Sequence, residues 1–426
     1  MIVAIIFVVL MVLGMPIGFA LGVAGVVGLF DMGGGMFLSQ GPSKVFNGLN
    51  VFPFLAMPFF ILAGEIMNHI GITSRLVKFA QALVGHMRGG LAHTNMLASV
   101  FFAGLTGAAT ADAAAFGKTL VPAMVERGYR RDYACAVTAA GSIIGPTIPP
   151  SGLMVVYGSL MGVSIGGLFA AGILPGLMIC LICMTVIAVT ARSKNLPKNE
   201  RRASLLEVWK IFKSSITALI MPLIILGGIL GGIVTPTEAA SVAVAYALFI
   251  GVFVYRALSF ADFFRMLVRT ARVTGVIFVI IAFASILGWW LSFNRIPQEV
   301  ASMVLGVSEN PYIVIFMIVG LLLMIGMVMD INAILIILAP VLVPLTVQIG
   351  MDPIHAGIIF ILALNISLMT PPVGACLFVL SSVTGEKLEK IAAQLWPFLL
   401  AELGVLFLFA FWSDLALVIP RLLGFR

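Results

Sequence analysis

Two Pro-Pro pairs stand at matching places in a chain that nearly repeats itself. Leu120–Leu153 and Leu342–Ala375 align without a gap, and the alignment places Pro149-Pro150 over Pro371-Pro372. Proline has no amide hydrogen and clashes with the preceding helical turn, so backbone carbonyls near each pair lose their helical partners. Such carbonyls, together with Ser and Thr hydroxyls, are hard oxygen ligands that suit a small cation. The paired breaks therefore predict a cation site in each half of the chain.

A single break of this kind is most simply a proline kink. Two breaks at matched positions favour ion sites, because paired Gly/Pro-interrupted segments in the two halves of a membrane protein indicate a transporter's binding site. The first site would use the stretch Gly145–Gly152. The second would use Ser367, Met369 and Thr370, ahead of the second proline pair.

Two carboxylates fall inside apolar segments. Asp112 follows the small-residue stretch Thr106–Thr110, and a carboxylate at membrane depth is costly enough to be functional by default. The alternative for Asp112 is structural, as a partner of Lys118 or as a helix cap. Asp330, with Asn332 close by, holds a similar place in the second half. For Asp330 a helix cap is favoured over contact with a substrate.

The composition predicts a polytopic membrane protein. The 426 residues are 62% hydrophobic and 10% charged, which is more apolar surface than a soluble domain of this size could bury. The net charge of +7 comes from Lys and Arg that lie mostly between apolar runs, as the positive-inside rule expects, so nucleic-acid binding is not predicted. We find no HExxH or P-loop pattern, and we expect neither an enzyme nor an organic cofactor.

The elements that must position these residues are helices, and the fold class is an all-α membrane protein with nine full spans. Basic clusters flank Gly89–Glu126 on both sides, so this segment is predicted to be a re-entrant helical hairpin, with Pro311–Gly350 as its counterpart. Five spans separate the hairpins, which makes the repeats inverted in topology. The predicted spans are Ile2–Phe30, Phe52–Ile72, Tyr133–Leu160, Leu168–Ala191, Ile216–Val234, Glu238–Tyr255, Val273–Phe293, Ala356–Val383 and Leu395–Leu417.

Scaffold and transport segments are expected to alternate along the chain. The predicted parts are a scaffold with an interfacial arm (1–88), a first transport repeat with its broken helix at 145–152 (89–191), further scaffold (192–310), a second transport repeat broken at 367–374 (311–393) and a last span (394–426). Arg201–Lys213 and Ser259–Thr274 each have one apolar and one basic face, which fits an interfacial helix or an ordinary connecting helix equally well.

Three stretches resemble the large membrane subunit of tripartite ATP-independent periplasmic (TRAP) transporters. They are Met15–Gly22, Ala103–Asp112 and Gly141–Ser151, and the resemblance covers essentially the whole chain. It implies an elevator-type Na⁺ symporter for organic acids in the bacterial inner membrane. It also implies two partners, a periplasmic substrate-binding protein and a small four-helix membrane subunit. Sialic acid is the favoured substrate and a C4-dicarboxylate the next.

The resemblance also implies two Na⁺ sites. The first would use Thr106, Gly145, Ile148 and Pro150, and the second Gly326, Val328, Thr370 and Pro372. The family's first hairpin tip commonly reads Ser-Gly-Ser, whereas this chain has Thr106-Gly107-Ala108 and so has one hydroxyl fewer. Substrate is expected between the hairpin tips, and the candidate contacts are Asp112, Thr147, Asp330 and Asn332.

Other functions stay open at this point. A stand-alone carrier resembling the divalent-anion/sodium symporters would work without a binding protein. An intramembrane enzyme would use Asp112 and Asp330 as a catalytic pair. A channel-like protein would show neither saturation nor Na⁺ dependence.

Overall fold

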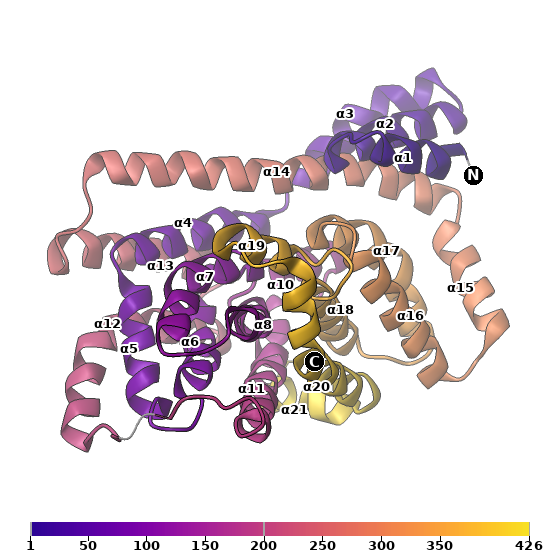
Figure 1. Cartoon of the computed structure of the whole chain (residues 1–426). Helices are drawn as coiled ribbons and strands as arrows, with labels where there is room; N and C mark the ends of the chain where they lie inside the picture. The colour runs from indigo at the N-terminus through magenta and orange to yellow at the C-terminus, as the bar shows by residue number, and fades with distance from the viewer. Residues whose placement is uncertain (1, 199–200, 426) are drawn as a thin grey trace.

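All the secondary-structure elements of the described residues are helices (Figure 1). This computed structural model describes residues 2–198 and 201–425, apart from the side chains of Leu105 and Thr106. Within these residues, six helices are long and apolar enough to cross a membrane, and two bent helix pairs raise the number to eight. The protein is therefore a multi-pass membrane protein.

The first half of the chain runs from α1 to α11. Its elements are α1 (Ile2–Val12), α2 (Ile17–Asp31), α3 (Gly35–Leu49), η1 (Phe52–Leu55), α4 (Ala56–His69), α5 (Ile72–Val84), α6 (Gly90–Thr106), α7 (Ala109–Glu126), α8 (Arg131–Ser142), α9 (Ile144–Thr147), α10 (Gly152–Met161) and α11 (Ile165–Thr190). The two-helix form predicted for Gly89–Glu126 is present, as α6 and α7 joined at Gly107 and Ala108.

The second half runs from α12 to α21. Its elements are α12 (Leu205–Leu230), α13 (Pro236–Phe249), η2 (Ile250–Val254), α14 (Phe260–Phe293), α15 (Ile296–Val307), α16 (Pro311–Gly326), α17 (Ile331–Gln348), α18 (Pro353–Ser367), α19 (Ala375–Thr384), α20 (Leu388–Phe411) and α21 (Ser413–Leu422). The segment 311–350 again forms a helix pair, α16 and α17.

The prediction of one span over Ile2–Phe30 is wrong, because the chain breaks between α1 and α2. Gly14 there has a φ of +83°, which glycine adopts readily, and Pro16 lacks an amide hydrogen. The predicted breaks at the two proline pairs are confirmed. Helix α9 ends before Pro149-Pro150, and α18 ends before Pro371-Pro372. The later predicted spans overlap the long helices α11, α12, α13, α14 and α20. The predicted end at Leu417 is wrong, because α20 ends at Phe411 and a separate helix, α21, follows.

The basic segments predicted to lie apart from the spans are continuous with them. Ser259–Thr274 is the first part of α14, a single helix of 34 residues, and α12 likewise begins at Leu205 and continues to Leu230. No proline interrupts the stretch from Phe260 to Phe293, so the backbone ladder runs through it. Figure 1 shows α14 extending across one side of the molecule, from α13 to the N-terminal helices.

Capping boxes set the starts of three of these helices. Ser204 with Glu207, Thr235 with Glu238, and Ser259 with Asp262 each exchange two hydrogen bonds, which satisfies amides at the helix N-terminus. Thr235, Pro236 and Thr237 form the turn into α13 and its first residues, and Glu238 lies in the first turn of that helix.

Glycines fix how closely α2 approaches α14. Gly18, Gly22, Gly25 and Gly28 lie on one face of α2, and a Cβ added to them would come within 2.7 to 3.0 Å of side chains on α14. Small residues at this spacing let helices in a membrane approach closely. The N-terminal helices are thereby held on α14, as Figure 1 shows.

The two repeats exchange their helices. Helix α10, which follows the first proline pair, packs on α17 of the second helix pair. The matching helix α19, which follows the second proline pair, packs on α7 of the first helix pair. Such a reciprocal exchange is what a two-fold relation between the repeats requires. It brings both breaks and both helix-pair tips to one region.

Candidate functional site

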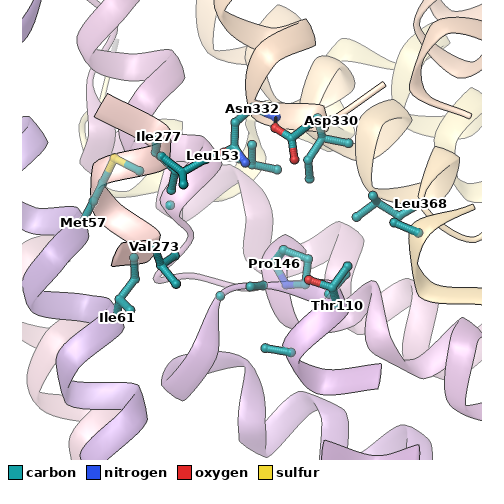
Figure 2. A pocket seen from close by; sticks show the side chains of 18 of the residues that line it. Met57, Ile61, Thr110, Pro146, Leu153, Val273, Ile277, Asp330, Asn332 and Leu368 are labelled. Atoms are coloured by element: carbon teal, nitrogen blue, oxygen red, sulfur yellow. Dashed lines mark hydrogen bonds between the residues drawn. The ribbon is translucent and has the colours of Figure 1, made fainter. Parts of the chain in front are cut away.

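A cavity of about 910 Å³ lies where the helix-pair tips and the proline breaks meet; we call it the main cavity. One wall comes from α4 and α14 and is almost wholly apolar. In Figure 2, Met57, Ile61, Val273 and Ile277 form this wall. The apolar wall gives a ligand no fixed polar contacts over most of its area.

The opposite wall of the main cavity is built by the repeats. Figure 2 shows Thr110, Pro146, Asp330 and Asn332 on this side, together with Leu368. Backbone of both tips lines it as well, from residues 107–111 of the first helix pair and 326–332 of the second. Polar groups are therefore concentrated on one side of the main cavity, close to the two helix breaks.

The first break exposes backbone at Gly145 and beyond. Pro149 has no amide hydrogen to donate to the carbonyl of Gly145, four residues earlier. After α9 the chain is extended at Ile148, with a ψ of 131°, and the Pro149–Pro150 peptide is cis. A Cβ on Gly107 would lie 3.0 Å from the carbonyl oxygen of Pro150. The tip of the first helix pair thus rests directly on the first break.

The second break repeats this arrangement with different side chains. The Pro371–Pro372 peptide is also cis. Pro371 cannot donate to the carbonyl of Ser367, which accepts instead from the backbone amide of Thr370 at 3.1 Å. The Thr370 hydroxyl donates to the carbonyl of Ile366 at 2.8 Å, and its oxygen keeps lone pairs that can accept. A Cβ on Gly326 would overlap the Ser367 hydroxyl, so the second helix pair also touches its break.

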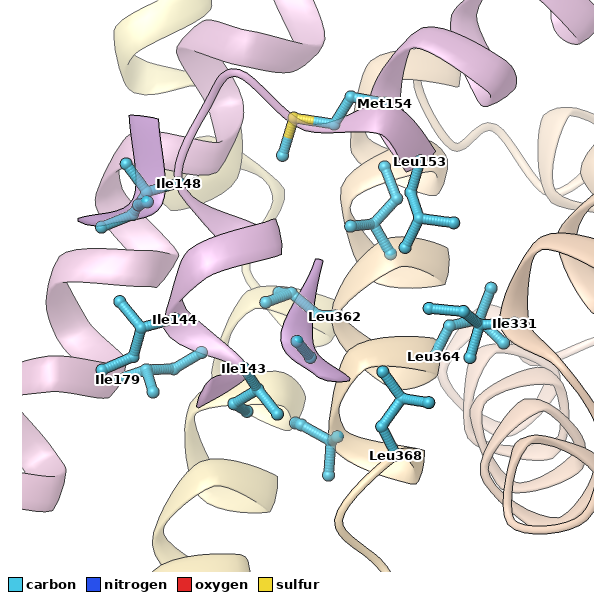
Figure 3. Packing of buried hydrophobic residues seen from close by; sticks show 14 of the residues in the cluster. Ile143, Ile144, Ile148, Leu153, Met154, Ile179, Ile331, Leu362, Leu364 and Leu368 are labelled. Carbon is cyan, nitrogen blue, oxygen red and sulfur yellow. The ribbon is translucent and has the colours of Figure 1, made fainter. Parts of the chain in front are cut away.

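A buried hydrogen bond joins the two breaks. The Asn365 side-chain amide donates to the hydroxyl of Thr147 over 3.1 Å, and both side chains are fully buried. Figure 3 shows buried apolar side chains of both repeats packed together, among them Ile143, Ile144 and Leu362. Thr147 therefore lies between the repeats, and it is not among the residues that line the main cavity.

Asp112 lies against the first break. Its side chain is fully buried, and a Cβ on Gly145 would overlap its Oδ2 atom. It does not line the main cavity. Lys118, the partner considered from the sequence, is exposed. Asp112 therefore places a carboxylate against Gly145, the residue whose carbonyl lacks the amide of Pro149 as a donor.

Asp330 caps α17 and also lines the main cavity. Its Oδ1 accepts from the backbone amides of Asn332 at 3.0 Å and Ala333 at 3.2 Å. The helix cap favoured from the sequence is confirmed. Asn332 lines the same side of the main cavity. In the matching helix α7 the N-cap residue is Ala108, whose methyl side chain cannot accept a hydrogen bond from the first amides of the helix.

The residues predicted as Na⁺ ligands are brought together by the fold. Gly145, Ile148 and Pro150 belong to the first break, next to the tip of the first helix pair, while the side chain of Thr106 lies outside the described part of the structure. For the second site, Gly326 and Val328 lie at the tip of the second pair, and Thr370 and Pro372 lie in its break.

Several residues of the site carry no local sequence signal. Asn365 and the apolar wall on α4 and α14 are ordinary members of apolar helices. Glu65 and Asn68, near the end of α4, line the main cavity as well. Only the packing of distant helices brings these residues to the site.

Comparison with known proteins decides the family. The chain matches the family model of the tripartite ATP-independent periplasmic transporter, DctM component, over residues 4–415. The chain belongs to the TRAP transporter large permease family. The resemblance seen in the sequence is thereby confirmed, and the permease is a transporter component, not an enzyme.

Relatives of the permease extend over nearly its whole length. It is 38% identical to the sialic acid TRAP transporter large permease SiaM of Vibrio cholerae, over 96% of this chain and 95% of that protein. It is 38% identical to the 2,3-diketo-L-gulonate TRAP transporter large permease YiaN of Escherichia coli, over 95% of each. It is 39% identical to the C4-dicarboxylate TRAP transporter large permease DctM of Pseudomonas aeruginosa, over 89% of each.

A solved structure shares the fold of the permease. The YdaH transporter of Alcanivorax borkumensis superposes with a TM-score of 0.64 over 89% of both chains, at 16% sequence identity. At this identity the likeness concerns the fold alone.

Proposed function

We propose that this permease performs Na⁺-coupled uptake of an organic acid across the bacterial inner membrane. The relatives named for sialic acid, C4-dicarboxylates and 2,3-diketo-L-gulonate differ in substrate. Each of these substrates carries at least one carboxylate, which is the shared chemistry. Sialic acid is the first candidate, and a C4-dicarboxylate is the second.

The two unlike walls of the main cavity carry this proposal. Most polar groups and both breaks belong to the repeats, while α4 and α14 offer a surface that is apolar except at Glu65 and Asn68 near the end of α4. A wall that is apolar over most of its area can slide past the repeats with few hydrogen bonds to break. The two inverted repeats would then move together across the membrane as an elevator. Residues 1–88 and 192–310 would form much of the fixed scaffold.

The oxygen atoms at the breaks fit two Na⁺ ions. At the first, the buried Asp112 carboxylate lies against Gly145, and Ile148, Pro150 and Thr106 would complete the ligand set. At the second, the Ser367 hydroxyl lies against Gly326, and Val328, Thr370 and Pro372 would complete the set. Carbonyl, hydroxyl and carboxylate oxygens are the donors that hard cations prefer.

The substrate carboxylate would bind at the N-terminus of α7. Thr110 and its neighbours line the main cavity there, and the first amides of a helix are a ready site for an anion. Ala108 has no side chain with which to occupy them, whereas Asp330 already occupies two amides of α17. Asn332 would contact polar groups at the other end of the substrate.

Coupling follows if ion binding orders the tips. Each tip touches a break, at Gly107 and at Gly326, so an ion held in the break stabilises the conformation that presents amides to the substrate. Substrate then binds a site that is already formed, and the two ligands favour each other by the same factor.

Two partners are part of this proposal. The chain spans only 67% of the sialic acid permease SiaT of Haemophilus influenzae and 63% of the isethionate permease DctMQ of Oleidesulfovibrio alaskensis. The additional length in those relatives fits a fused small four-helix subunit, the membrane partner that we propose for this permease. A periplasmic binding protein would deliver the substrate.

Uptake into proteoliposomes tests the proposal. The vesicles hold the permease with its small membrane partner, and labelled sialic acid and then succinate are offered with and without an inward Na⁺ gradient and the binding protein. Uptake that needs both supports the proposal. Uptake that needs Na⁺ alone would favour a stand-alone carrier, and uptake indifferent to Na⁺ would overturn the assignment of the breaks as ion sites.

A further inference from the structure

A second cavity, of about 520 Å³, lies beside the main cavity. It lies between the C-terminal end of α4 and the N-terminal part of α14, and its lining residues are Glu65, Asn68, His69, Asp262, Arg265, Met266, Val268, Arg269 and Arg272. Glu65 and Asn68 also line the main cavity. The two cavities therefore meet at the last turns of α4.

The second cavity holds more positive than negative charge. Arg265 pairs with Asp262, and Arg269 donates to the Glu65 carboxylate over 3.2 Å. Arg272 takes part in none of the ion pairs of the described residues. Three guanidinium groups therefore share one concave space with two carboxylates, and the His69 imidazole lies 3.6 Å from one of these, that of Asp262.

The existing ion pairs are weak enough to open. The side chains of Arg265 and Arg269 are 76% and 70% exposed, and exposed ion pairs contribute little free energy because water screens them. A guanidinium group presents a planar fork of donors that matches a carboxylate in two parallel hydrogen bonds. A carboxylate that enters the second cavity can therefore bind Arg272 directly and exchange with Glu65 on Arg269.

We propose that the second cavity is an anion site in which Arg265, Arg269 and Arg272 hold the carboxylate of the transported acid next to the main cavity. This inference rests on the organic-acid transport proposed above and adds a binding step to it. Positive charge in a concave site raises the local concentration of anions. The acid would occupy the second cavity on its way into or out of the main cavity, past Glu65 and Asn68.

Uptake kinetics of arginine variants test this site. Arg272→Gln removes a charge without breaking a described ion pair, and we expect KM for succinate and sialic acid to rise about tenfold with kcat kept, as for one lost charge-assisted hydrogen bond. The triple variant Arg265→Gln/Arg269→Gln/Arg272→Gln should raise KM further. Its uptake at low substrate should also lose the dependence on ionic strength that wild type shows.

Three further variants separate charge from structure. Arg272→Lys keeps the charge and should recover part of the lost affinity. Glu65→Gln removes the carboxylate that competes for Arg269 and should lower KM, the opposite direction. Arg421→Gln is the matched control, because Arg421 makes an exposed ion pair with Asp414 outside both cavities. This control should leave KM unchanged.

Equilibrium binding separates failure of this site from failure of Na⁺ coupling. Labelled sialic acid and succinate are bound to the purified permease with its small subunit, without any gradient. Weaker binding by the triple variant supports the anion site even if uptake ignores Na⁺. If the triple variant has the same binding affinity, KM and salt dependence as wild type, the anion site is overturned. Na⁺-driven uptake would not be affected by that result. Binding is also measured in vesicles with and without phosphatidylglycerol. If the triple variant retains less of this lipid than wild type but binds the acids equally well, the second cavity binds lipid headgroups, and the proposed anion site is overturned.

Discussion

Asn365 of the second repeat donates a 3.1 Å hydrogen bond to Thr147 of the first. The two residues lie at or near the last residues of α18 and α9, just before the two breaks. Thr147 in turn donates to the carbonyl of Ile143 at 2.7 Å. Both side chains are fully buried, so no water competes for the bond. The two candidate ion sites are thus mechanically linked through one amide and one hydroxyl.

This link should be measurable as a coupling energy. In a double-mutant cycle of Thr147→Val and Asn365→Leu, we expect a coupling of about 0.6 kcal/mol, and at most about 1.7 kcal/mol, as for hydrogen bonds between membrane helices. The measurement is the unfolding free energy of the purified protein in detergent. Additive effects of the two substitutions would show that the bond does not couple the repeats.

The same cycle should appear in transport. If the link passes order from one break to the other, each single variant raises the Na⁺ concentration needed for half-maximal uptake, and the double variant raises it no further. Independent, multiplying effects on that concentration would contradict a shared link.

Gly145→Ala should disrupt the first ion site. The new Cβ would overlap the Asp112 Oδ2 atom, so the carboxylate must move away from the break. We expect Na⁺-dependent uptake to fall by about tenfold or more, the effect of misplacing one cation ligand, which is of the order of 1.4 kcal/mol. The measurement is initial uptake as a function of Na⁺ concentration.

Gly227→Ala is the control for this substitution. A Cβ at Gly227, on α12, meets nothing within 4 Å, and alanine is favoured over glycine in a helix. It should leave uptake and stability at or above wild type. If Gly145→Ala behaves like Gly227→Ala, the contact between Asp112 and the break has no role in ion binding.

Gly326→Ala should affect the second ion site. Its Cβ would overlap the Ser367 hydroxyl, which separates the tip of the second helix pair from its break. We expect weaker Na⁺ dependence with normal assembly, checked by uptake and by size-exclusion chromatography. Gly320→Ala, on the same helix with nothing within 4 Å, should have no effect. Equal behaviour of the two variants would refute the role of this contact.

Asp330 offers a test of capping against binding. Asp330→Ala removes the cap of α17 and should cost about 1 kcal/mol of stability, whereas Asp330→Asn keeps an oxygen that can cap. Thermal unfolding measures this difference. If Asp330 acts only as a cap, Asp330→Asn transports like wild type. A large loss of uptake in a stable Asp330→Asn protein would show that its charge serves the substrate or the ion.

The features predicted correctly from the sequence act over a few residues. The breaks at Pro149-Pro150 and Pro371-Pro372 and the cap at Asp330 depend on groups within one helical turn. Such local effects are the same in any fold. The wrong prediction over Ile2–Phe30 came from hydrophobicity, which does not record where an apolar run stops being one helix.

The sequence by itself therefore determined the class of protein, the internal repeat and the position of its helix breaks. The tertiary structure alone decided that Asp112 lies on Gly145, that Asn365 meets Thr147, and that α4 and α14 form the apolar wall. The physical reason is that a membrane helix is apolar on every side, so its pattern does not specify which face meets which neighbour. Contacts between residues far apart in the chain depend on how all the helices pack together.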